Sequence, residues 1–469
     1  MSVDEIRRFF EPRSVAVVGA SRNPVKFGSV VVYNLKNMGF PGTFSIVNSE
    51  AGTEEIRGVR CYPSIKSMDK PPELAVLAVP ARSVTAVIRE CADVGVKNVV
   101  IISSGFSEAG ESGQKMLDEM LTIVRKVGIR IVGPNTTGIL SPGARFTTTF
   151  VPLPSNLKRG SVAFISQTGM FAGVMLSHIL TAERFGVSRV AGLGNKCDVD
   201  DSDILEFLYD DPDTRAVMIY MEGASSGRRF LETARWFSQK KPIVLLKGGR
   251  TPEGAKAAFS HTGSLAGRYE VMEDIFRREG IILAGDMDEM IDYAKILAYQ
   301  GLPRGMRLGV VSMSGGAAVM ASDVTSEIGL QLAKVTREEL RGIQELLPEW
   351  ARVNHPLDIE PLMERVGGNE AYKISMETIL KCTGVDMALL IVGLGIFDEE
   401  RESKIVDVLI PVVKSAAKPL AVALLGPRSH CDHVAALLEE MKIPTYMSIT
   451  RAVKSLTALA AYARVRGKH

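Results

Sequence analysis

The sequence predicts an α/β protein of three domains, each built around a parallel sheet with crossover helices. Short apolar runs rich in β-branched residues alternate along the chain with longer helical patterns, which is the signature of repeated strand–helix–strand units. The 469 residues are too many for one ordinary core and suit two or three such domains. Hydrophobic residues make up 46% of the chain and charged residues 23%, a composition typical of a well-packed protein.

The first domain is predicted over residues 1–143. A loop rich in Pro and Thr, from Ser141 to Pro154, is expected to separate it from the next domain. Five apolar runs indicate a Rossmann-like sheet in this stretch, namely Ser14–Val18, Phe44–Val47, Leu74–Val79, Asn98–Ser103 and Ile129–Gly133.

The second domain is predicted over residues 155–301 and the third over residues 305–469, with a joint at the segment LPRGMR. The two resemble each other, which indicates an internal repeat. The second opens with SVAFISQTGMFAGVM and the third with RLGVVSMSGGAAVMA, while KKPIVLLKGGR has a counterpart in AKPLAVALLGPR. Only the first copy continues into SHTG, so we expect two similar scaffolds with the chemistry placed on one of them.

Charge and cysteine content exclude several classes of protein. The formal net charge is +2 and no Lys/Arg cluster forms a basic stripe, so nucleic acid is not an expected partner. No apolar stretch approaches the roughly 18 residues of a membrane span, which predicts a cytoplasmic protein without a membrane partner. The five cysteines lack CxxC spacing and are expected to be free thiols. His430, Cys431, Asp432 and His433 lie at an expected helix start, where polar residues are common, so no metal site is predicted.

The first strand ends in VVGASRNPVKFGS, where a glycine permits a tight turn and the next helix points its free N–H groups at an anion. We expect a phosphate-bearing nucleotide at this turn. Ala20 and Ser21 follow Gly19, so the second glycine of GxGxxG is missing and NAD is disfavoured. A purely structural turn between strand and helix is the alternative.

Three further strand ends carry small or polar residues: Pro80 after the third run, Ser103 and Gly105 after the fourth, and Asn135 after the fifth. The carboxyl ends of parallel strands meet at one edge of the sheet, where open α/β sheets bind ligands. Each strand end alone fits ordinary turn chemistry. Together they favour a long ligand that lies across the sheet edge.

Two more turns are candidate phosphate cradles, because each ends an apolar run and begins a helix rich in small residues. They comprise Ser166, Gln167, Thr168 and Gly169 in the second domain, and Ser314, Gly315 and Gly316 in the third. Two helix N-termini aimed at one point would bind a phosphate through their N–H groups and macrodipoles. Glycine that serves only close packing is the alternative.

The segment GRTPEGAKAAFSHTGSLAG surrounds His261 with Ala, Gly, Ser and Thr, a composition that favours a mobile loop. An imidazole has an unperturbed pKa of about 6.5, so it is largely neutral at pH 7 and can accept a phosphoryl group. A histidine on such a loop can travel, which makes His261 a candidate nucleophile, and a loop histidine without a chemical role is the alternative.

The order of these motifs resembles one known family. SHTGSLAG is the most specific element, and it is supported by GASRNPVKFGS, VPA, SSGFSE, GPN, ISQTG, LGNKCDVDDSD, YMEG and NHPLD. Over almost its whole length the chain resembles the α subunit of archaeal ADP-forming acyl-CoA synthetases, relatives of succinyl-CoA synthetase. The resemblance implies an acid–thiol ligase with a Rossmann-like coenzyme A (CoA) domain followed by two flavodoxin-like domains.

Carried over position by position, the resemblance implies a CoA site at Gly19, Ala20, Ser21, Lys26, Gly28, Pro80, Ser103, Gly105 and Asn135. It also implies that His261 is phosphorylated and that Glu222, in YMEG, orients it. A carboxylate that accepts one ring N–H leaves the other nitrogen free. A surface charge at a strand end is the alternative for Glu222. Thr136, Thr168 and Met170 depart from the family's GPNC and SQSGA patterns, which leaves the acid substrate open.

The implied reaction converts acyl-CoA, phosphate and ADP reversibly into a carboxylic acid, CoA and ATP, through an acyl phosphate and a phosphohistidine. The chain contains no GxxxxGK[ST] loop, so the nucleotide is expected elsewhere. The resemblance implies a separate β subunit with an ATP-grasp fold, an α2β2 assembly, and Mg²⁺ bound with the nucleotide on that subunit. A non-catalytic CoA-binding regulatory protein and an NAD-linked dehydrogenase are the alternatives.

Overall fold

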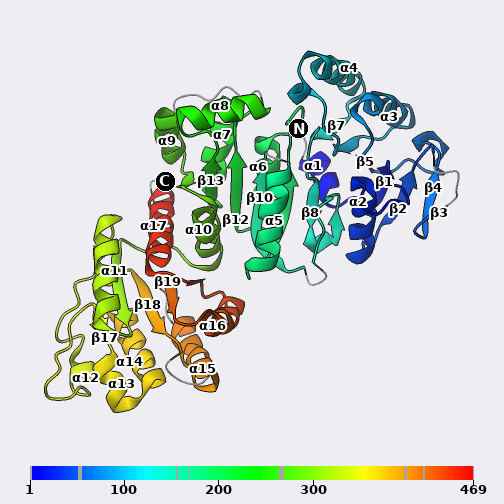
Figure 1. Cartoon of the computed structure of the whole chain (residues 1–469). Helices are drawn as coiled ribbons and strands as arrows, with labels where there is room; N and C mark the ends of the chain where they lie inside the picture. Colours follow the sequence, from blue (N-terminus) through cyan, green and yellow to red (C-terminus); the bar gives the residue numbers. More distant parts are fainter. Residues whose placement is uncertain are drawn as a thin grey trace. The chain divides into compact units, whose positions relative to one another are not determined.

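The chain forms two compact units, residues 1–283 and residues 284–469, each with strands and helices in alternation (Figure 1). The computed structural model describes residues 3–50, 55–154, 157–167, 169–262, 269–395, 399–415 and 418–467. The first unit is built on two sheets and the second on one, and most strand pairs are parallel. The predicted α/β class is confirmed.

The first sheet has the strand order β3-β4-β2-β1-β5-β6-β7. Its strands are β1 (Ser14–Val18), β2 (Thr43–Val47), β3 (Glu55–Ile56), β4 (Val59–Tyr62), β5 (Leu74–Leu77), β6 (Asn98–Ile101) and β7 (Arg130–Val132). The helices are α1 (Val3–Phe10), α2 (Phe27–Asn37), α3 (Ala81–Val94) and α4 (Glu111–Val127). All five predicted strands are confirmed. The short antiparallel pair β3–β4 was not predicted, because so few residues leave no clear periodicity.

The second sheet has the order β14-β13-β12-β10-β11-β8-β9. Its strands are β8 (Ile139–Ser141), β9 (Phe146–Thr147), β10 (Arg159–Ser166), β11 (Val187–Gly192), β12 (Ala216–Met221), β13 (Ile243–Lys247) and β14 (Ile282–Ala284). The helices are α5 (Met170–Ala182), α6 (Asp201–Tyr209), α7 (Gly227–Ser238), α8 (Pro252–Thr262) and α9 (Tyr269–Arg278).

The predicted separating loop, Ser141–Pro154, is more than a connection, because it contains β9 and the last residue of β8. β8 pairs antiparallel with β11 and with β9, so this segment extends the second sheet. The reason is burial, because Ile139, Leu140 and Phe146 are fully enclosed.

The third sheet confirms the internal repeat. Its order β16-β15-β18-β19-β20 matches the order β11-β10-β12-β13-β14 of the second sheet. Its strands are β15 (Arg307–Ser312), β16 (Gln331–Leu332), β17 (Leu357–Asp358), β18 (Met387–Gly393), β19 (Leu420–Leu425) and β20 (Thr445–Tyr446), with β17 also paired to β15. The helices are α11 (Gly315–Glu327), α12 (Arg341–Gln344), α13 (Glu360–Val366), α14 (Gly368–Lys381), α15 (Glu399–Ser415) and α16 (Arg428–Glu440).

Two equivalent helices close the repeat and pack on each other: α10 (Met287–Tyr299) follows β14, and α17 (Ile449–Arg466) follows β20. Arg451 clasps Asp292 with Nε–Oδ2 and NH2–Oδ1 distances of 2.5 and 2.9 Å, and Lys295 Nζ lies 3.0 Å from Glu439 Oε1. α10 therefore belongs to the second compact unit, although the second predicted domain extended to residue 301. The division into three domains stays a prediction.

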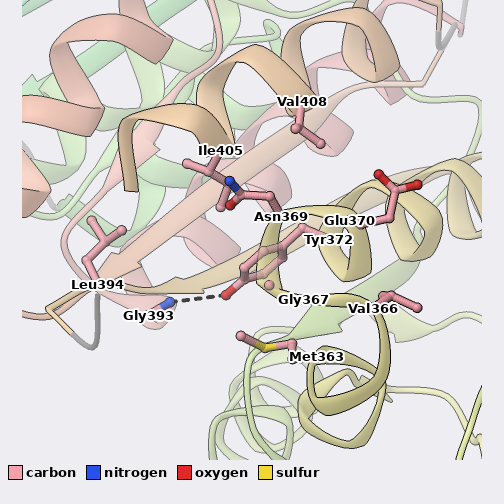
Figure 2. Close-up of a pocket in the computed structure, with 11 residues that line it drawn as sticks. Met363, Val366, Gly367, Asn369, Glu370, Tyr372, Gly393, Leu394, Ile405 and Val408 are labelled. Atoms are coloured by element: carbon pink, nitrogen blue, oxygen red, sulfur yellow. Dashed lines mark hydrogen bonds between the residues drawn. The ribbon is translucent and has the colours of Figure 1, made fainter. Parts of the chain in front are cut away.

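A cavity of about 520 Å³ opens in the second unit between α13, α14, β18 and α15. Tyr372 projects into it from α14, and its hydroxyl accepts a hydrogen bond from Gly393 N at 3.3 Å (Figure 2). Met363, Leu394 and Ile405 contribute apolar walls. No predicted site residue lines this cavity, and no sequence motif indicated it.

None of the helices in the described ranges has both the length and the apolar character needed to cross a bilayer. All five cysteines are free thiols, as predicted. Burial raises the pKa of the Cys91 thiol to about 12.

Candidate functional site

The predicted CoA residues lie at the carboxyl edge of the first sheet. Gly19, Pro80, Ser103 and Asn135 follow β1, β5, β6 and β7, and these four strands are consecutive neighbours. The structure therefore brings the predicted strand ends into one row. A row of this length suits an extended ligand.

Close backbone contacts explain the glycines at the start of this row. Gly19 has a φ of +95°, and a Cβ there would lie 2.5 Å from Ala78 O. A Cβ on Gly28, in the first turn of α2, would lie 2.9 Å from Ala20 N. Ser21 is held by Ser29, whose hydroxyl donates to Ser21 O at 2.9 Å. The N-terminus of α2 is thus held against the turn, with Lys26 as its N-cap.

A cavity of about 340 Å³ lies at this end of the row, lined by Gly19, Ser21, Lys26 and Pro80 among others. Asn48 also lines it and donates from Nδ2 to Ala20 O at 2.9 Å. Asn48 was not among the predicted site residues. Asn48 directly follows the apolar run that forms β2, just as the predicted residues follow their own strands. This position in the sequence could have identified it.

The other end of the row is fixed by polar contacts. The Ser103 hydroxyl donates to Val79 O, and Asn135 N donates to Ser103 O at 2.9 Å. Gly105 N donates to Glu108 Oε1 at 2.6 Å. Burial alone would raise the pKa of Glu108, but this bond and one from Asn195 lower it below its usual value. Glu108 is therefore a charged group at the edge of the predicted CoA site.

The loop after β11, residues 193–199, joins the two sheets of the first unit. Asn195 N donates to Pro134 O at 2.9 Å, and its Nδ2 donates to Glu108 Oε2 at 2.5 Å. A Cβ on Gly194 would lie 2.2 Å from Pro134 O, so only glycine fits there. This loop forms the first part of the LGNKCDVDDSD motif, for which no role was predicted.

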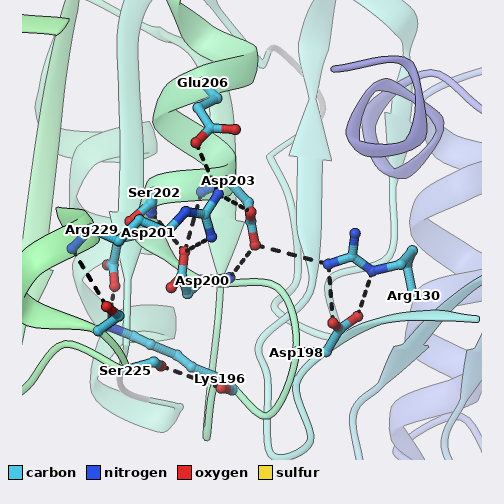
Figure 3. A network of polar contacts seen from close by, with 11 residues as sticks. Arg130, Lys196, Asp198, Asp200, Asp201, Ser202, Asp203, Glu206, Ser225 and Arg229 are labelled. Carbon is cyan, nitrogen blue, oxygen red and sulfur yellow. Dashed lines mark hydrogen bonds and ion pairs between the residues drawn. The ribbon is translucent and has the colours of Figure 1, made fainter. Parts of the chain in front are cut away.

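Behind the loop lies a network of acidic and basic groups (Figure 3). Lys196 Nζ binds Asp201 Oδ2 at 2.5 Å, and Arg229 binds Asp203 at 2.6 Å and Glu206 at 2.8 Å. Burial raises the pKa of Asp201, while the ammonium of Lys196 opposes that rise. The network anchors the start of α6 beneath the loop.

Glu222 is buried just beyond the end of β12, with 7% of its surface exposed. It is not the exposed charge that the alternative required. The Tyr220 hydroxyl donates to Glu222 Oε1 at 3.4 Å, and burial together with this carboxylate raises the pKa of Tyr220 to about 12. Glu222 is a candidate for the orienting role, which stays a prediction.

The first phosphate cradle lies beside the CoA row. A Cβ on Gly169 would lie 3.6 Å from both oxygens of Asn135, so the turn after β10 meets the turn after β7. Ser166 is fully buried, and Gln167 Oε1 accepts hydrogen bonds from the main chain at residues 222 and 223. Thr168 lies outside the described residues. Phosphate binding at this turn stays a prediction.

Thr136, which departs from the family pattern, is buried, and its hydroxyl makes main-chain contacts. It donates to Gly192 O and accepts from Gly138 N at 2.8 Å. These bonds fix the path from β7 to β8. Thr136 therefore has a structural role that the sequence did not indicate.

His261 lies in the last turn of α8, so the expectation of a loop is wrong for residues 252–262. Thr251 caps the helix, accepting at Oγ1 from Gly254 N at 3.0 Å, and three alanines follow, which have the highest helix propensity. α8 contacts the turn at residues 107–109, beside the CoA row. The remainder of the motif, residues 263–268, lies outside the described residues.

The second phosphate cradle belongs to the second unit. Ser314 is the N-cap of α11 and accepts at Oγ from Ala317 N. A Cβ on Gly315 would lie 3.0 Å from the Asp358 carboxylate, whereas Gly316 has open space around it. A phosphate at this turn would lie beside that carboxylate, and the two negative charges would repel each other. This weighs against the predicted phosphate site.

The His430 cluster lies at the start of α16. Cys431 is buried, and Arg428 Nε binds Asp432 Oδ2 at 3.0 Å. Across the described part of the chain, no three His, Cys, Asp or Glu side chains are grouped to hold a metal ion.

Comparisons with known proteins agree with this layout. The family model of a CoA binding domain matches residues 13–142, and that of a succinyl-CoA ligase like flavodoxin domain matches residues 159–297. ADP-forming acetate–CoA ligase II of Archaeoglobus fulgidus is 39% identical over 99% of this chain and 68% of its own length.

The α subunit of ADP-forming acetate–CoA ligase I of Pyrococcus furiosus is 37% identical over 99% of both chains. A solved structure, dinucleotide forming acetyl-coenzyme A synthetase 1 of Ca. Korarchaeum cryptofilum in complex with phosphate and ADP, has a TM-score of 0.89 and 33% identity. It covers 98% of this chain and 97% of its own.

Proposed function

The chain belongs to the family of ADP-forming acetate–CoA ligase α subunits, and we propose that it converts an acyl-CoA, phosphate and ADP reversibly into a carboxylic acid, CoA and ATP. The observation that carries this proposal is the row of strand ends in the first unit, where Asn135 of the CoA edge adjoins Gly169 of the phosphate turn. CoA and phosphate would meet where these two turns meet.

The reaction has three balanced steps. Phosphate attacks the thioester carbon, the C–S bond breaks, and CoA leaves as its thiol while an acyl phosphate forms. An imidazole nitrogen of His261 then attacks the phosphorus and releases the carboxylate. ADP finally takes the phosphoryl group from His261 to form ATP.

Residues of this chain would serve the first two steps. Gly19, Ser21 and Lys26 line the cavity that would take the phosphate-bearing end of CoA, with the N-terminus of α2 beside it. Glu222 would accept a ring N–H of His261 and so leave the other nitrogen to react. His261 lies near the end of α8, the helix that follows β13, and β13 is the neighbour of β12, the strand that precedes Glu222.

The nucleotide would bind to a partner subunit. The Pyrococcus furiosus relative is named as an α subunit, which supports a partner for this chain as well. An ATP-grasp fold for that β subunit, an α2β2 assembly, and Mg²⁺ bound with the nucleotide there complete the proposal. The free energy released when the thioester is cleaved would thus drive ATP formation. One histidine would carry the phosphoryl group from this chain to the nucleotide on the β subunit.

The alternative, a non-catalytic CoA-binding regulatory protein, gains no support, because the relatives described above are named as ligases and synthetases. The choice is tested by purifying the chain with its co-expressed β subunit and measuring ATP formation from ADP, phosphate and a panel of acyl-CoA thioesters. We expect ATP synthesis that depends on all three substrates. CoA binding without ATP from any thioester would support the regulatory alternative instead.

A further inference from the structure

Side chains bind all four main-chain hydrogen-bonding groups of Glu222 and Gly223. Gln167 Oε1 accepts from Glu222 N and from Gly223 N, each at 2.9 Å. Lys247 Nζ donates to Glu222 O at 2.7 Å, and Lys196 Nζ donates to Gly223 O at 3.1 Å. Two N–H groups and two carbonyls are therefore held from three directions.

These three side chains come from the ends of three different strands. Gln167 follows β10, Lys196 lies in the loop after β11, and Lys247 ends β13. β10 and β13 are the two neighbours of β12, whose last residue is Met221. Beyond that residue the chain leaves the sheet, so its polar groups need other partners when buried. The partners found here fix the path of the chain at Glu222.

The three side chains that bind this turn are buried. Gln167, Lys196 and Lys247 are 7%, 6% and 3% exposed. A buried ammonium is unfavourable unless a carboxylate or several acceptors surround it. Lys196 has Asp201 as its ion-pair partner, whereas Lys247 donates to two carbonyls, Glu222 O and Gly248 O. The fold thus maintains two buried cations around one turn.

We propose that Gln167, Lys196 and Lys247 are positioning residues for Glu222. They set the direction in which the side chain of Glu222 points at the end of β12. They also hold Glu222 in place when the ring of His261 binds to it. This inference rests on the proposed function, in which Glu222 orients His261. It assigns Gln167 to the support of Glu222 rather than to phosphate, and it gives a role to Lys196 of the LGNKCDVDDSD motif.

The test compares two buried lysines at opposite ends of β13. Lys247→Met removes the donor to Glu222 O. Lys241→Met is the matched control, because Lys241 Nζ is also buried and donates to two carbonyls, Leu208 O and Asp211 O, both at 2.6 Å. Gln167→Met is a second test variant, which removes the acceptor for both N–H groups. Each variant is purified with the β subunit.

The measurement is the rate of phosphohistidine formation from labelled phosphate without ADP, using the acyl-CoA that supports ATP synthesis in the screen above. We expect Lys247→Met and Gln167→Met to slow it about tenfold to hundredfold, since small misplacements of a reacting group have effects of that size. Lys241→Met should form phosphohistidine at the wild-type rate. CoA affinity, measured by calorimetry, should be unchanged in all three variants.

A double-mutant cycle separates positioning from general loosening of the fold. In a Glu222→Gln background, Lys247→Met should cause little further loss, because its effect passes through Glu222. The inference would be overturned if the double variant showed the full product of the two single rate losses. It would also be overturned if Lys241→Met slowed phosphohistidine formation as much as Lys247→Met. If wild type itself forms no phosphohistidine, the proposed function fails. If wild type and Glu222→Gln behave as proposed while Lys247→Met and Gln167→Met match wild type, only the positioning inference fails.

Discussion

Asp198 and Arg130 form a two-pronged ion pair between the two sheets of the first unit, with Oδ2–Nε and Oδ1–NH2 distances of 2.8 and 3.0 Å (Figure 3). Asp198 Oδ2 also accepts from Ile131 N at 2.8 Å. The side chain of Arg130 is only 17% exposed and that of Asp198 only 24%. One carboxylate therefore ties the loop after β11 to the first two residues of β7.

Asp198→Ala should lower the free energy of unfolding of the first unit by about 2 to 3 kcal/mol, because it leaves a largely buried guanidinium and an N–H group without their acceptor. Chemical denaturation measures the change. Glu119→Ala is the control, since the Arg89–Glu119 pair is 58% and 55% exposed and its loss should cost less than about 1 kcal/mol. Equal losses in the two variants would contradict this account.

His261→Asn should abolish ATP synthesis and leave CoA binding nearly unchanged, because it removes the phosphoryl acceptor from the end of α8 and leaves the CoA row intact. ATP formation with the β subunit and calorimetry with CoA measure the two properties. His178→Asn, at a histidine whose side chain is 40% exposed on α5, is the control and should remain active. ATP synthesis by His261→Asn near the wild-type rate would remove the histidine from the mechanism.

Glu222→Gln should reduce the yield and lifetime of phosphohistidine by at least about tenfold, because the amide keeps the shape of the carboxylate but loses its charge. Its main chain should stay in place, since Gln167 and Lys247 bind it through the backbone. Quenched-flow labelling measures the formation and decay. Unchanged kinetics in the variant would exclude Glu222 from the site.

The purified chain without its β subunit should form at most a bound phosphoenzyme, and no ATP. Phosphoryl transfer needs donor and acceptor in line at about 3 to 3.5 Å, and the sequence has no GxxxxGK[ST] loop to hold the nucleotide. Mass spectrometry verifies that no partner remains, and adding the β subunit should restore turnover. Sustained ATP synthesis by the isolated chain would sink the two-subunit mechanism.

His355 should make the second unit sensitive to acid. Burial lowers its pKa from 6.5 to about 4, and its Nε2 accepts from Val310 N at 2.8 Å. Between these pH values the unfolded chain binds a proton that the folded chain does not. The stability contributed is therefore complete above pH 6.5 and lost as the pH falls towards 4, by up to about 3 kcal/mol.

His355→Gln keeps a hydrogen-bond acceptor and cannot titrate. Denaturation of the wild type and of the variant between pH 7 and pH 4 measures the difference. The free energy of unfolding of the wild type, relative to that of the variant, should fall as the pH drops from 6.5 towards 4. Parallel curves would show that His355 does not titrate with folding.

Local pattern predicted much of the first unit correctly. The apolar runs gave β1, β5, β6 and β7, because a strand buried on both faces is recognisable from its own residues. The same runs placed Gly19, Pro80, Ser103 and Asn135 at strand ends, and parallel strands place such ends at one edge. The repeat was also visible, since similar strand–turn–helix segments fold alike.

Local composition failed where helix propensity and turn chemistry compete. The stretch before His261 contains alanine as well as Gly, Ser and Thr, and the cap at Thr251 decides for a helix up to residue 262. β9 and the last residue of β8 were taken for part of a loop because these strands are only two or three residues long. Their strand state depends on tertiary pairing, of β8 with β11 and of β9 with β8, which no local pattern reports.

By itself the sequence determined the α/β class, the repeat, the strand-end residues and the family motifs, because each depends on residues that are close together in the chain. The tertiary structure alone decided what those residues do to one another. Gln167 and Glu222 are 55 positions apart, and Lys196 meets Gly223 across 27. Such contacts arise only when β10, β11, β12 and β13 are ordered in one sheet, since strand order, and not sequence distance, sets which strand ends become neighbours.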